Sequence, residues 1–300
     1  MDYSGILLLD KPSGISSHDL VAITRKDLGM KQVGHAGTLD PLASGLMVLL
    51  LGEATKISDY VLSDDKSYEC EILLGQTTDT LDIDGKATSN KEVDLDLDTI
   101  LQVAKSLKGD FEWEIPLYSA KKIKGKKLYE LAREDIEIAT KPTKLMSFSS
   151  VEVLSYEKPY VRVHLKCSKG SFVRTWVNEF GKKLGCGACV SALRRKSSGS
   201  FHIDHAITTE HLKNRNFGKS YIDINRALTK FPAIEIRGID RHLVRNGQIS
   251  HLLQARLAMV DRYQEQVVDV IKLVDDRSKL LALVNRGRGG RFRFRRVFQA

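Results

Sequence analysis

The chain has 300 residues, of which 42% are hydrophobic and 28% are charged, a balance typical of a globular protein with a sizeable core. Basic residues outnumber acidic ones by 47 to 38, and the net charge of +9 favours a polyanionic partner, nucleic acid before a membrane surface. The longest apolar run, residues 46–51, is far shorter than the roughly 20 residues of a membrane-spanning helix, and the N-terminus lacks a signal-peptide pattern. We therefore expect a cytoplasmic protein.

Residues 34–56, GHAGTLDPLASGLMVLLLGEATK, place a histidine, several glycines and an Asp-Pro pair directly before that apolar run. Asp40 followed by proline is typical of the first turn of a helix, with the aspartate as the N-cap. The surrounding glycines favour a second interpretation, because glycine lets the backbone approach a ligand closely. His35 is a candidate base or ligand, although a lone histidine more often has neither role. The residues alone leave both interpretations of Asp40 open.

Alternating apolar and polar residues predict two half-buried strands further along the chain. In SYECEILLG, residues 67–75, Tyr68 shares a face with apolar residues at every second position, and YVRVHLKC, residues 160–167, alternates in the same way. Residues 97–107 and 174–185 have apolar residues at helical spacing, and the second segment ends at a glycine that suits a C-terminal cap. Strands and helices without regular alternation predict an α+β fold with a large mixed, mainly antiparallel sheet and flanking helices.

Three sequence patterns resemble a metal or redox site, a calcium loop and a glycosidase carboxylate pair, but their residues do not meet the requirements of these sites. Cys186 and Cys189 form a C-x-x-C motif, but the two remaining cysteines lie in predicted strands, and no thioredoxin-like context surrounds the pair. GQTTDTLDIDGK, residues 75–86, resembles a calcium loop, yet Thr80 and Lys91 stand where that loop needs acids. Nothing fixes the separation of its carboxylates as glycoside hydrolysis would require. We expect no metal and no cofactor.

Two basic segments indicate contact with a phosphate backbone. KKIKGKKLYELAR, residues 121–133, has five lysines within seven residues, beside an aromatic residue. Such a run usually forms a solvated face, but in a basic protein phosphate contact is the better interpretation. RGRGGRFRFRRVF, residues 286–298, alternates phenylalanine with arginine, which predicts a strand with one apolar and one basic face rather than a disordered RGG-like tail. The candidates for RNA contact in the first segment are Lys121, Lys124, Lys126 and Lys127.

A second unit is predicted after Phe231 and Pro232, because short apolar runs recur from there at close spacing. Residues 257–260, 267–274 and 280–284 are such runs. They predict a small β-rich domain over residues 233–300, which follows a larger domain over residues 1–232.

The motifs in chain order resemble those of one family. GILLLDKPSGISSHD, GHAGTLDPLASG, LGEATK, KSYEC, GQTTDTLDIDG, IPLYSAKKIKGKKLYELAR, CSKGSFVRT, LGCGACVSALRR and SGSFHIDHAITTEHL together cover roughly residues 5–212. The series resembles the TruB family of pseudouridine synthases, whose target is uridine 55 in the T loop of tRNA. The resemblance implies a pseudouridine synthase fold over residues 1–232 and a PUA-like RNA-binding domain over residues 233–300. It also implies a monomeric isomerase that acts on tRNA without guide RNA, metal or cofactor.

The resemblance further assigns roles to individual residues. Asp40 would be the nucleophile, Tyr68 would stack against the target base, and Arg174 would pair with Asp40, since an adjacent cation favours the charged carboxylate. The other implied contacts are His35 in the space left by the flipped uridine, Leu193 as a wall of the base pocket, Lys11 and Pro12 as its support, Phe172 as a stacking residue, and Asp82 as a second partner of Arg174.

Three residues depart from the family pattern. Phe172 stands where many relatives have tyrosine, Asp135 where glycine is usual, and Cys189 where histidine is frequent. Stacking by residue 172 survives the first change, but any role for the hydroxyl does not. The third change further weakens a metal site at the C-x-x-C motif.

The implied reaction breaks the N1–C1′ bond, turns the base and rejoins it through C5, so no redox cofactor is needed. The base must first leave its stack, at a cost of a few kcal/mol, which stacking on Tyr68 and phosphate contacts would offset. Attack of Asp40 on C1′ or on C6, or elimination through a glycal, all remain open. Two other functions also stay open: an RNA-folding protein whose effect does not need modification, and a related synthase directed by guide RNA, which the compact C-terminal unit disfavours.

Overall fold

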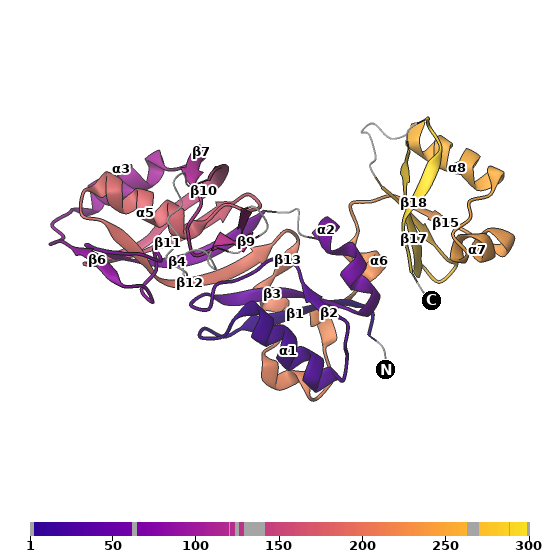
Figure 1. Ribbon diagram of the computed structural model, residues 1–300, viewed down its shortest axis with the longest axis horizontal. Helices are drawn as coiled ribbons and strands as arrows, with labels where there is room; N and C mark the ends of the chain where they lie inside the picture. The colour runs from indigo at the N-terminus through magenta and orange to yellow at the C-terminus, as the bar shows by residue number, and fades with distance from the viewer. Residues whose placement is uncertain are drawn as a thin grey trace.

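A ten-stranded mixed sheet forms the larger part of the computed structural model, which describes residues 3–61, 65–119, 121–123, 126–128, 142–262, 270–287 and 289–298 (Figure 1). Its strands are β1 (Gly5–Lys11), β2 (Val33–His35), β3 (Ser44–Leu51), β4 (Lys66–Leu74), β7 (Gly109–Glu114), β10 (Thr143–Glu157), β11 (Tyr160–Cys167), β12 (Ala188–Ser198), β13 (Phe201–His202) and β14 (Tyr221–Asp223). The order is β14-β1-β3-β12-β4-β11-β10-β7, with β2 beside β3 and β13 beside β12. Only β3 and β12 pair in parallel, so the predicted mainly antiparallel sheet is confirmed.

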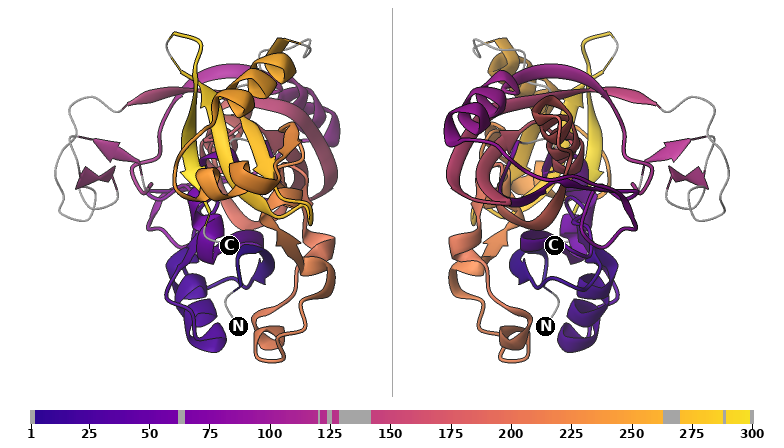
Figure 2. Two further views of the ribbon diagram at one scale, coloured as in Figure 1. Left: turned by 90° about the vertical axis from the view of Figure 1, so that its right-hand side faces the viewer. Right: turned by 90° about the vertical axis from the view of Figure 1, so that its left-hand side faces the viewer.

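Three helices cover one face of this sheet: α1 (Ser17–Leu28), α3 (Leu97–Ser106) and α5 (Val173–Leu184). The helices predicted over residues 97–107 and 174–185 are confirmed, and the second ends at Gly185, whose φ of 80° is the left-handed conformation of a C-terminal cap. The shorter helical segments are η1 (Gly52–Ile57), α2 (Ser58–Val61), η2 (Ile203–His205), η3 (Thr209–Leu212), η4 (Gly218–Ser220) and α6 (Ile224–Ala227). Helix α1 and η3 lie together at one edge of the molecule (Figure 2).

The apolar run at residues 46–51 belongs to β3, which is buried on both faces. Met47 and Leu49 pack in the cluster that contains α1, α3 and α5. Val48 and Leu50 point to the other face and join a second cluster with C-terminal residues such as Leu283. Successive side chains of a strand alternate between faces, so a strand covered on both sides needs an unbroken apolar sequence.

A four-stranded sheet with two helices forms the C-terminal unit, at the end of the molecule beside α2 and α6 (Figure 1). It contains β15 (Ala233–Glu235), α7 (Gly238–Arg245), α8 (His251–Arg262), β16 (Ile271–Val274), β17 (Leu280–Arg286) and β18 (Phe292–Val297). The apolar run at residues 257–260 lies in α8, so it is helical rather than part of a strand. The alternation expected near the C-terminus is present in β18, where Phe292 is buried and Arg293 is exposed. The boundary at residue 232 stays a prediction, because apolar residues on both sides of it share one cluster.

Two small hairpins complete the described elements. One consists of β5 (Gln76–Thr78) and β6 (Ala87–Asn90), and the other of β8 (Lys122–Ile123) and β9 (Lys126–Lys127). In the part of the chain that the structure describes, no helix is long and apolar enough to cross a membrane.

Candidate active site

A cavity of about 340 Å³ opens on the face of the large sheet that carries α5. Its lining brings together five residues predicted from the sequence to form the site of reaction: Asp40, Tyr68, Phe172, Arg174 and Leu193. These residues come from a loop, from two strands and from the start of α5. A cavity of this size is sufficient for a small ligand.

Asp40 lies in the loop between β2 and β3. The backbone N–H of Ala43 donates to the Asp40 carbonyl at 3.1 Å, which closes a single turn and does not begin a helix. The N-cap interpretation is therefore wrong, because a partner distant in sequence takes the carboxylate. Its Oδ2 lies 2.9 Å from Nε of Arg174, while 38% of the side chain remains exposed.

Arg174 is held on every side of its guanidinium although it is only 5% exposed. Its two terminal nitrogens donate to the carbonyls of Thr80 at 2.9 Å and Tyr118 at 2.8 Å. Asp82 lies 3.6 Å from one of them. Burial raises the pKa of Asp82, although a hydrogen bond from Thr80 and the charge of Arg174 oppose that rise. The arginine is thus fixed in place, with its Nε 2.9 Å from Oδ2 of Asp40.

Tyr68 is 8% exposed and packs in the core with its ring beside the cavity. In the sheet it stands opposite Leu165 of β11 and Arg195 of β12. Burial raises the pKa of its phenol, while the charge of Arg195 opposes the rise. A neutral aromatic ring held by strands on both sides is suited to stack against a flat base.

Hydrogen bonds from the segment after β1 hold the Asp40 loop in place. The Ser17 hydroxyl donates to the Leu39 carbonyl at 2.9 Å and accepts from the Leu39 N–H at 2.8 Å. The Gly14 N–H donates to the Pro41 carbonyl at 2.9 Å. These bonds fix the backbone on both sides of Asp40, as a preorganised site requires.

Arg195 also holds this loop through hydrogen bonds. It was not among the residues predicted from the sequence. It is 0% exposed, and its Nε donates to the Leu46 carbonyl at 2.7 Å. Its terminal nitrogens donate to the carbonyls of Gly37 at 3.2 Å and Thr38 at 3.4 Å. Strand alternation could have indicated Arg195: it is two residues from Leu193 in β12, so the two side chains share a face.

Lys11 is also fully buried and connects the end of β1 to the loop. Its ammonium donates to the carbonyls of Pro12 at 2.9 Å, Ile15 at 2.7 Å and Pro41 at 3.4 Å. Burial lowers the pKa of Lys11 to about 8, although the charge of Asp40 raises it. Lys11 therefore contacts the Asp40 loop through its bond to the Pro41 carbonyl. Pro12 is exposed and contributes its carbonyl as an acceptor for Lys11.

The lowered pKa of Lys11 predicts a pH-dependent stability difference from the Lys11→Met variant. Between about 8 and the ordinary value of 10.5, the unfolded chain binds a proton that the folded chain has lost. The free energy of unfolding contributed by this group therefore rises with pH in that window, by up to about 3 kcal/mol. Urea unfolding of both proteins across the window measures it, and a difference independent of pH would contradict the assignment.

The remaining predicted residues lie at the edge of the cavity or outside it. His35 is in β2, its ring centroid 5.7 Å from that of His18 in an edge-to-face contact, and burial is the main reason that its pKa is lowered. Lys121 is exposed and lines the cavity. Of Lys126 and Lys127 only the backbone, in β9, is described. Two further residues of the sequence analysis lie outside the described residues, namely Lys124 and Asp135.

Three more lysines, which were not among the predicted site residues, also line the cavity: Lys66, Lys144 and Lys169. They lie in β4, in β10 and in the loop before α5. Lys66 and Lys169 stand within the KSYEC and CSKGSFVRT motifs but were not predicted as site residues, and no motif contains Lys144. The cysteines of the C-x-x-C motif are buried free thiols. Within the described ranges, no three histidine, cysteine or acidic side chains gather as metal ligands.

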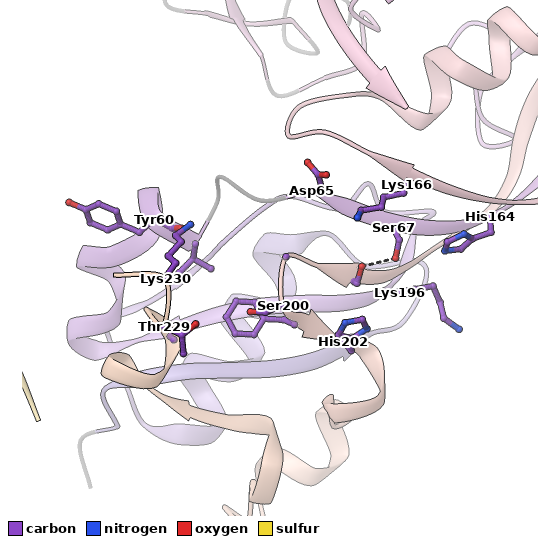
Figure 3. A pocket seen from close by; sticks show the side chains of 15 residues that line it. Tyr60, Asp65, Ser67, His164, Lys166, Lys196, Ser200, His202, Thr229 and Lys230 are labelled. Atoms are coloured by element: carbon purple, nitrogen blue, oxygen red, sulfur yellow. Dashed lines mark hydrogen bonds between the residues drawn. The ribbon is translucent and has the colours of Figure 1, made fainter. Parts of the chain in front are cut away.

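A larger hollow of about 850 Å³ lies on the opposite face of the sheet (Figure 3). Ser67 and Lys166 line it and pair across β4 and β11, directly beside the pair of Tyr68 and Leu165. Neighbouring pairs point to opposite faces of a sheet, so the sheet separates this hollow from Asp40. None of the candidate residues from the sequence lines it.

Solved structures share the fold of this chain. Over 98% of this chain and 85% of the other, the structure matches a chain of the "Crystal Structure of a Cbf5-Nop10-Gar1 Complex" with a TM-score of 0.69 and 23% identity. A second match, "Structure of H/ACA RNP bound to a substrate RNA containing 2'-deoxyuridine", covers 99% and 85% with a TM-score of 0.66 and 21% identity. The likeness shows the fold, which is the pseudouridine synthase fold.

Sequence comparison then gives the family. Residues 25–173 match the N-terminal domain of the TruB family of pseudouridylate synthases, and residues 174–228 match the tRNA pseudouridylate synthase B C-terminal domain. The tRNA pseudouridine synthase B of Bdellovibrio bacteriovorus is 43% identical over 99% of this chain and 97% of its own length. That of Syntrophotalea carbinolica is 38% identical over 79% of each. The chain belongs to the TruB family and is a pseudouridine synthase, an isomerase.

Proposed function

We propose that this enzyme isomerises uridine 55 in the T loop of tRNA, with Asp40 as the nucleophile and with the target base flipped into the cavity. One observation carries the proposal: an ionisable carboxylate, partly exposed, lies 2.9 Å from a buried arginine at the edge of a cavity walled by Tyr68. The tRNA substrate follows the names of the relatives that match nearly the whole chain.

The two carboxylate oxygens of Asp40 have different surroundings. Arg174 holds Oδ2, and no described residue donates a hydrogen bond to Oδ1, which leaves that oxygen for attack. In the reaction the N1–C1′ bond breaks, the C5–C1′ bond forms, C5 loses a proton and N1 gains one. Atoms and electrons balance without an oxidant. A positioned carboxylate can therefore carry the covalent step at C1′ or C6.

Base flipping is part of the proposal because Asp40 lines a cavity that is walled by Tyr68 and Leu193. A stacked uridine would not reach Oδ1, and unstacking it costs a few kcal/mol. Tyr68 offers a new stacking partner, and Leu193 closes the pocket with apolar surface. For His35, which lies in β2 outside the cavity lining, we propose that it occupies the gap left in the RNA.

The C-terminal unit is proposed as a PUA-like RNA-binding domain over residues 233–300. The exposed arginines of β18 support this, because Arg293 and Arg295 form a basic row on the strand. We further propose a monomer that works in the cytoplasm without guide RNA, metal or cofactor. The residues that line the cavity suffice for an isomerisation with a carboxylate nucleophile.

Mapping of pseudouridine in a T-arm RNA tests the proposed function. The purified enzyme, without guide RNA, is expected to convert the single uridine at position 55 and to leave other uridines unchanged. A T-loop RNA with cytidine at that position serves as the control and should yield no product. Product at a different uridine, or a requirement for guide RNA, would overturn the substrate assignment.

A second function, assistance to tRNA folding, is favoured by the same geometry. To place the base beside Asp40, the enzyme must open the T loop, so binding alone can help a misfolded elbow rearrange. The basic surfaces near the cavity and on β18 support binding that does not depend on chemistry. Rescue of tRNA folding by a variant without isomerase activity would separate the two functions.

A further inference from the structure

The lining of the active-site cavity carries more positive charge than a uracil base requires. Of its described side chains, one is acidic and six are basic, the latter being Lys66, Lys121, Lys144, Lys169, Arg174 and Arg195. The two arginines are occupied, one by Asp40 and both by backbone carbonyls. Uracil is uncharged, so an excess of lysines indicates a charged group next to the base.

Three of these lysines, Lys121, Lys144 and Lys169, form what we call the lysine rim. Burial lowers the pKa of Lys144, and the positive charges of Lys121 and Lys169 lower it further, so the Lys144 ammonium lies close enough to each of the other two to be repelled by it. In the described part of the chain, no carboxylate forms an ion pair with any of them. Like charges held together without a counterion are costly, and an anion between them removes that cost.

One short loop holds two of the rim lysines, Lys144 and Lys169, close to α5. The Lys144 ammonium donates to the Lys169 carbonyl at 3.1 Å, directly before α5 and Arg174. Gly170, with φ of +77°, lets Lys144 cross the loop, because a Cβ at that position would overlap the ammonium group. The loop thus holds Lys144 and Lys169 next to the start of α5, the helix that carries Arg174.

We propose that the lysine rim binds the phosphodiester group of the RNA strand that adjoins the flipped uridine. The inference rests on the proposed function in that the enzyme acts on a uridine within RNA. Ammonium groups from β10, from the loop before α5 and from the segment before β8 surround the oxygens of that phosphate, while the neutral base enters beside Tyr68. The rim therefore distinguishes a uridine within a strand from a free nucleoside and retains the flipped nucleotide in the cavity.

A thermodynamic cycle between protein and RNA tests this contact. Lys144→Gln and Lys169→Gln are combined in an Asp40→Asn background, so that binding is measured without turnover. The T-arm RNA carries either a normal phosphate or one neutral methylphosphonate linkage beside the target uridine. We expect the double substitution to weaken binding of normal RNA by about 10- to 100-fold and to lower the salt slope by about 1 for each lysine removed. It should have little effect on methylphosphonate RNA, because the two changes remove the same contact.

Two controls keep the outcomes distinct. Lys105→Gln removes an exposed lysine of α3 outside the cavity lining and should leave the phosphate dependence unchanged. Arginine at positions 144 and 169 should restore most of the affinity, since it keeps the charge. Additive losses for the lysine and phosphate changes would overturn the rim assignment while leaving uridine-55 modification intact. Failure of pseudouridine mapping at position 55 would instead overturn the substrate and would leave the cycle measurable on the RNA that is modified.

Discussion

Replacement of Asp40 by asparagine is expected to reduce pseudouridine formation by about 10³-fold or more, because an amide oxygen is a far weaker nucleophile than a carboxylate. The two side chains have the same shape, and Asp40 is partly exposed, so the loop and its hydrogen bonds should persist. Binding of T-arm RNA should therefore remain while the chemical step is lost. Single-turnover assays separate the two effects, because they report the rate of the bound complex.

Asp84→Asn is the matched control for this substitution. Asp84 is an exposed carboxylate close in sequence to Asp82, and it does not line the cavity. Its variant should retain the wild-type single-turnover rate. Product formation by Asp40→Asn at a rate near that of wild type would remove the nucleophile from the proposal, and an unfolded variant would be recognised by its circular dichroism spectrum.

Arg195→Met is expected to lower the free energy of unfolding by about 3–5 kcal/mol. Methionine fills much of the volume but donates no hydrogen bond, so the Leu46 carbonyl loses its donor in a buried place and the Gly37 and Thr38 carbonyls lose theirs in a partly buried one. Since Gly37 and Thr38 belong to the segment that leads into the Asp40 loop, activity should fall together with stability. Chemical denaturation and single-turnover rates measure both.

The neighbouring residue provides a direct comparison. Arg194 lies on the same strand, is 38% exposed, and forms an ion pair with Asp10 at 2.6 Å. A partly solvated pair of this kind contributes about 1 kcal/mol or less. Arg194→Met should therefore have a small effect. Equal losses in the two variants would mean that the burial of Arg195 is not what stabilises the loop.

Local periodicity was sufficient to predict several of the elements but not how they are arranged. Alternation placed Tyr68 on the buried face of a strand because a half-buried strand has a period of two. Helix α5 and its glycine cap were visible because capping is decided within a few residues. The parallel contact between β3 and β12 joins segments about 150 positions apart, and no local pattern specifies such a pairing.

The residues of the candidate site also fall into two groups: those that the sequence indicates, and those that only the fold brings together. The Asp-Pro pair has the local preference of a helix start, but the buried guanidinium of Arg174 interacts with the carboxylate more strongly than a cap would. Lys144 and Lys169 are ordinary lysines in sequence, and only folding brings them to one cavity. Asp40 and Tyr68 were found through the family resemblance together with a strand pattern. The supporting residue Arg195 was not found, because its partners are backbone carbonyls.

The double burial of β3 also bears on how this enzyme can evolve. Every side chain from Leu46 to Leu51 is buried against one of two cores, so any substitution there must satisfy a packed environment with little freedom to relax. The Asp40 loop is thus attached to a stretch of chain in which few changes are neutral. The lysines at the mouth of the cavity include exposed side chains, which can be exchanged at lower cost. Sequence drift can therefore alter which RNAs are bound while the position of Asp40 stays the same.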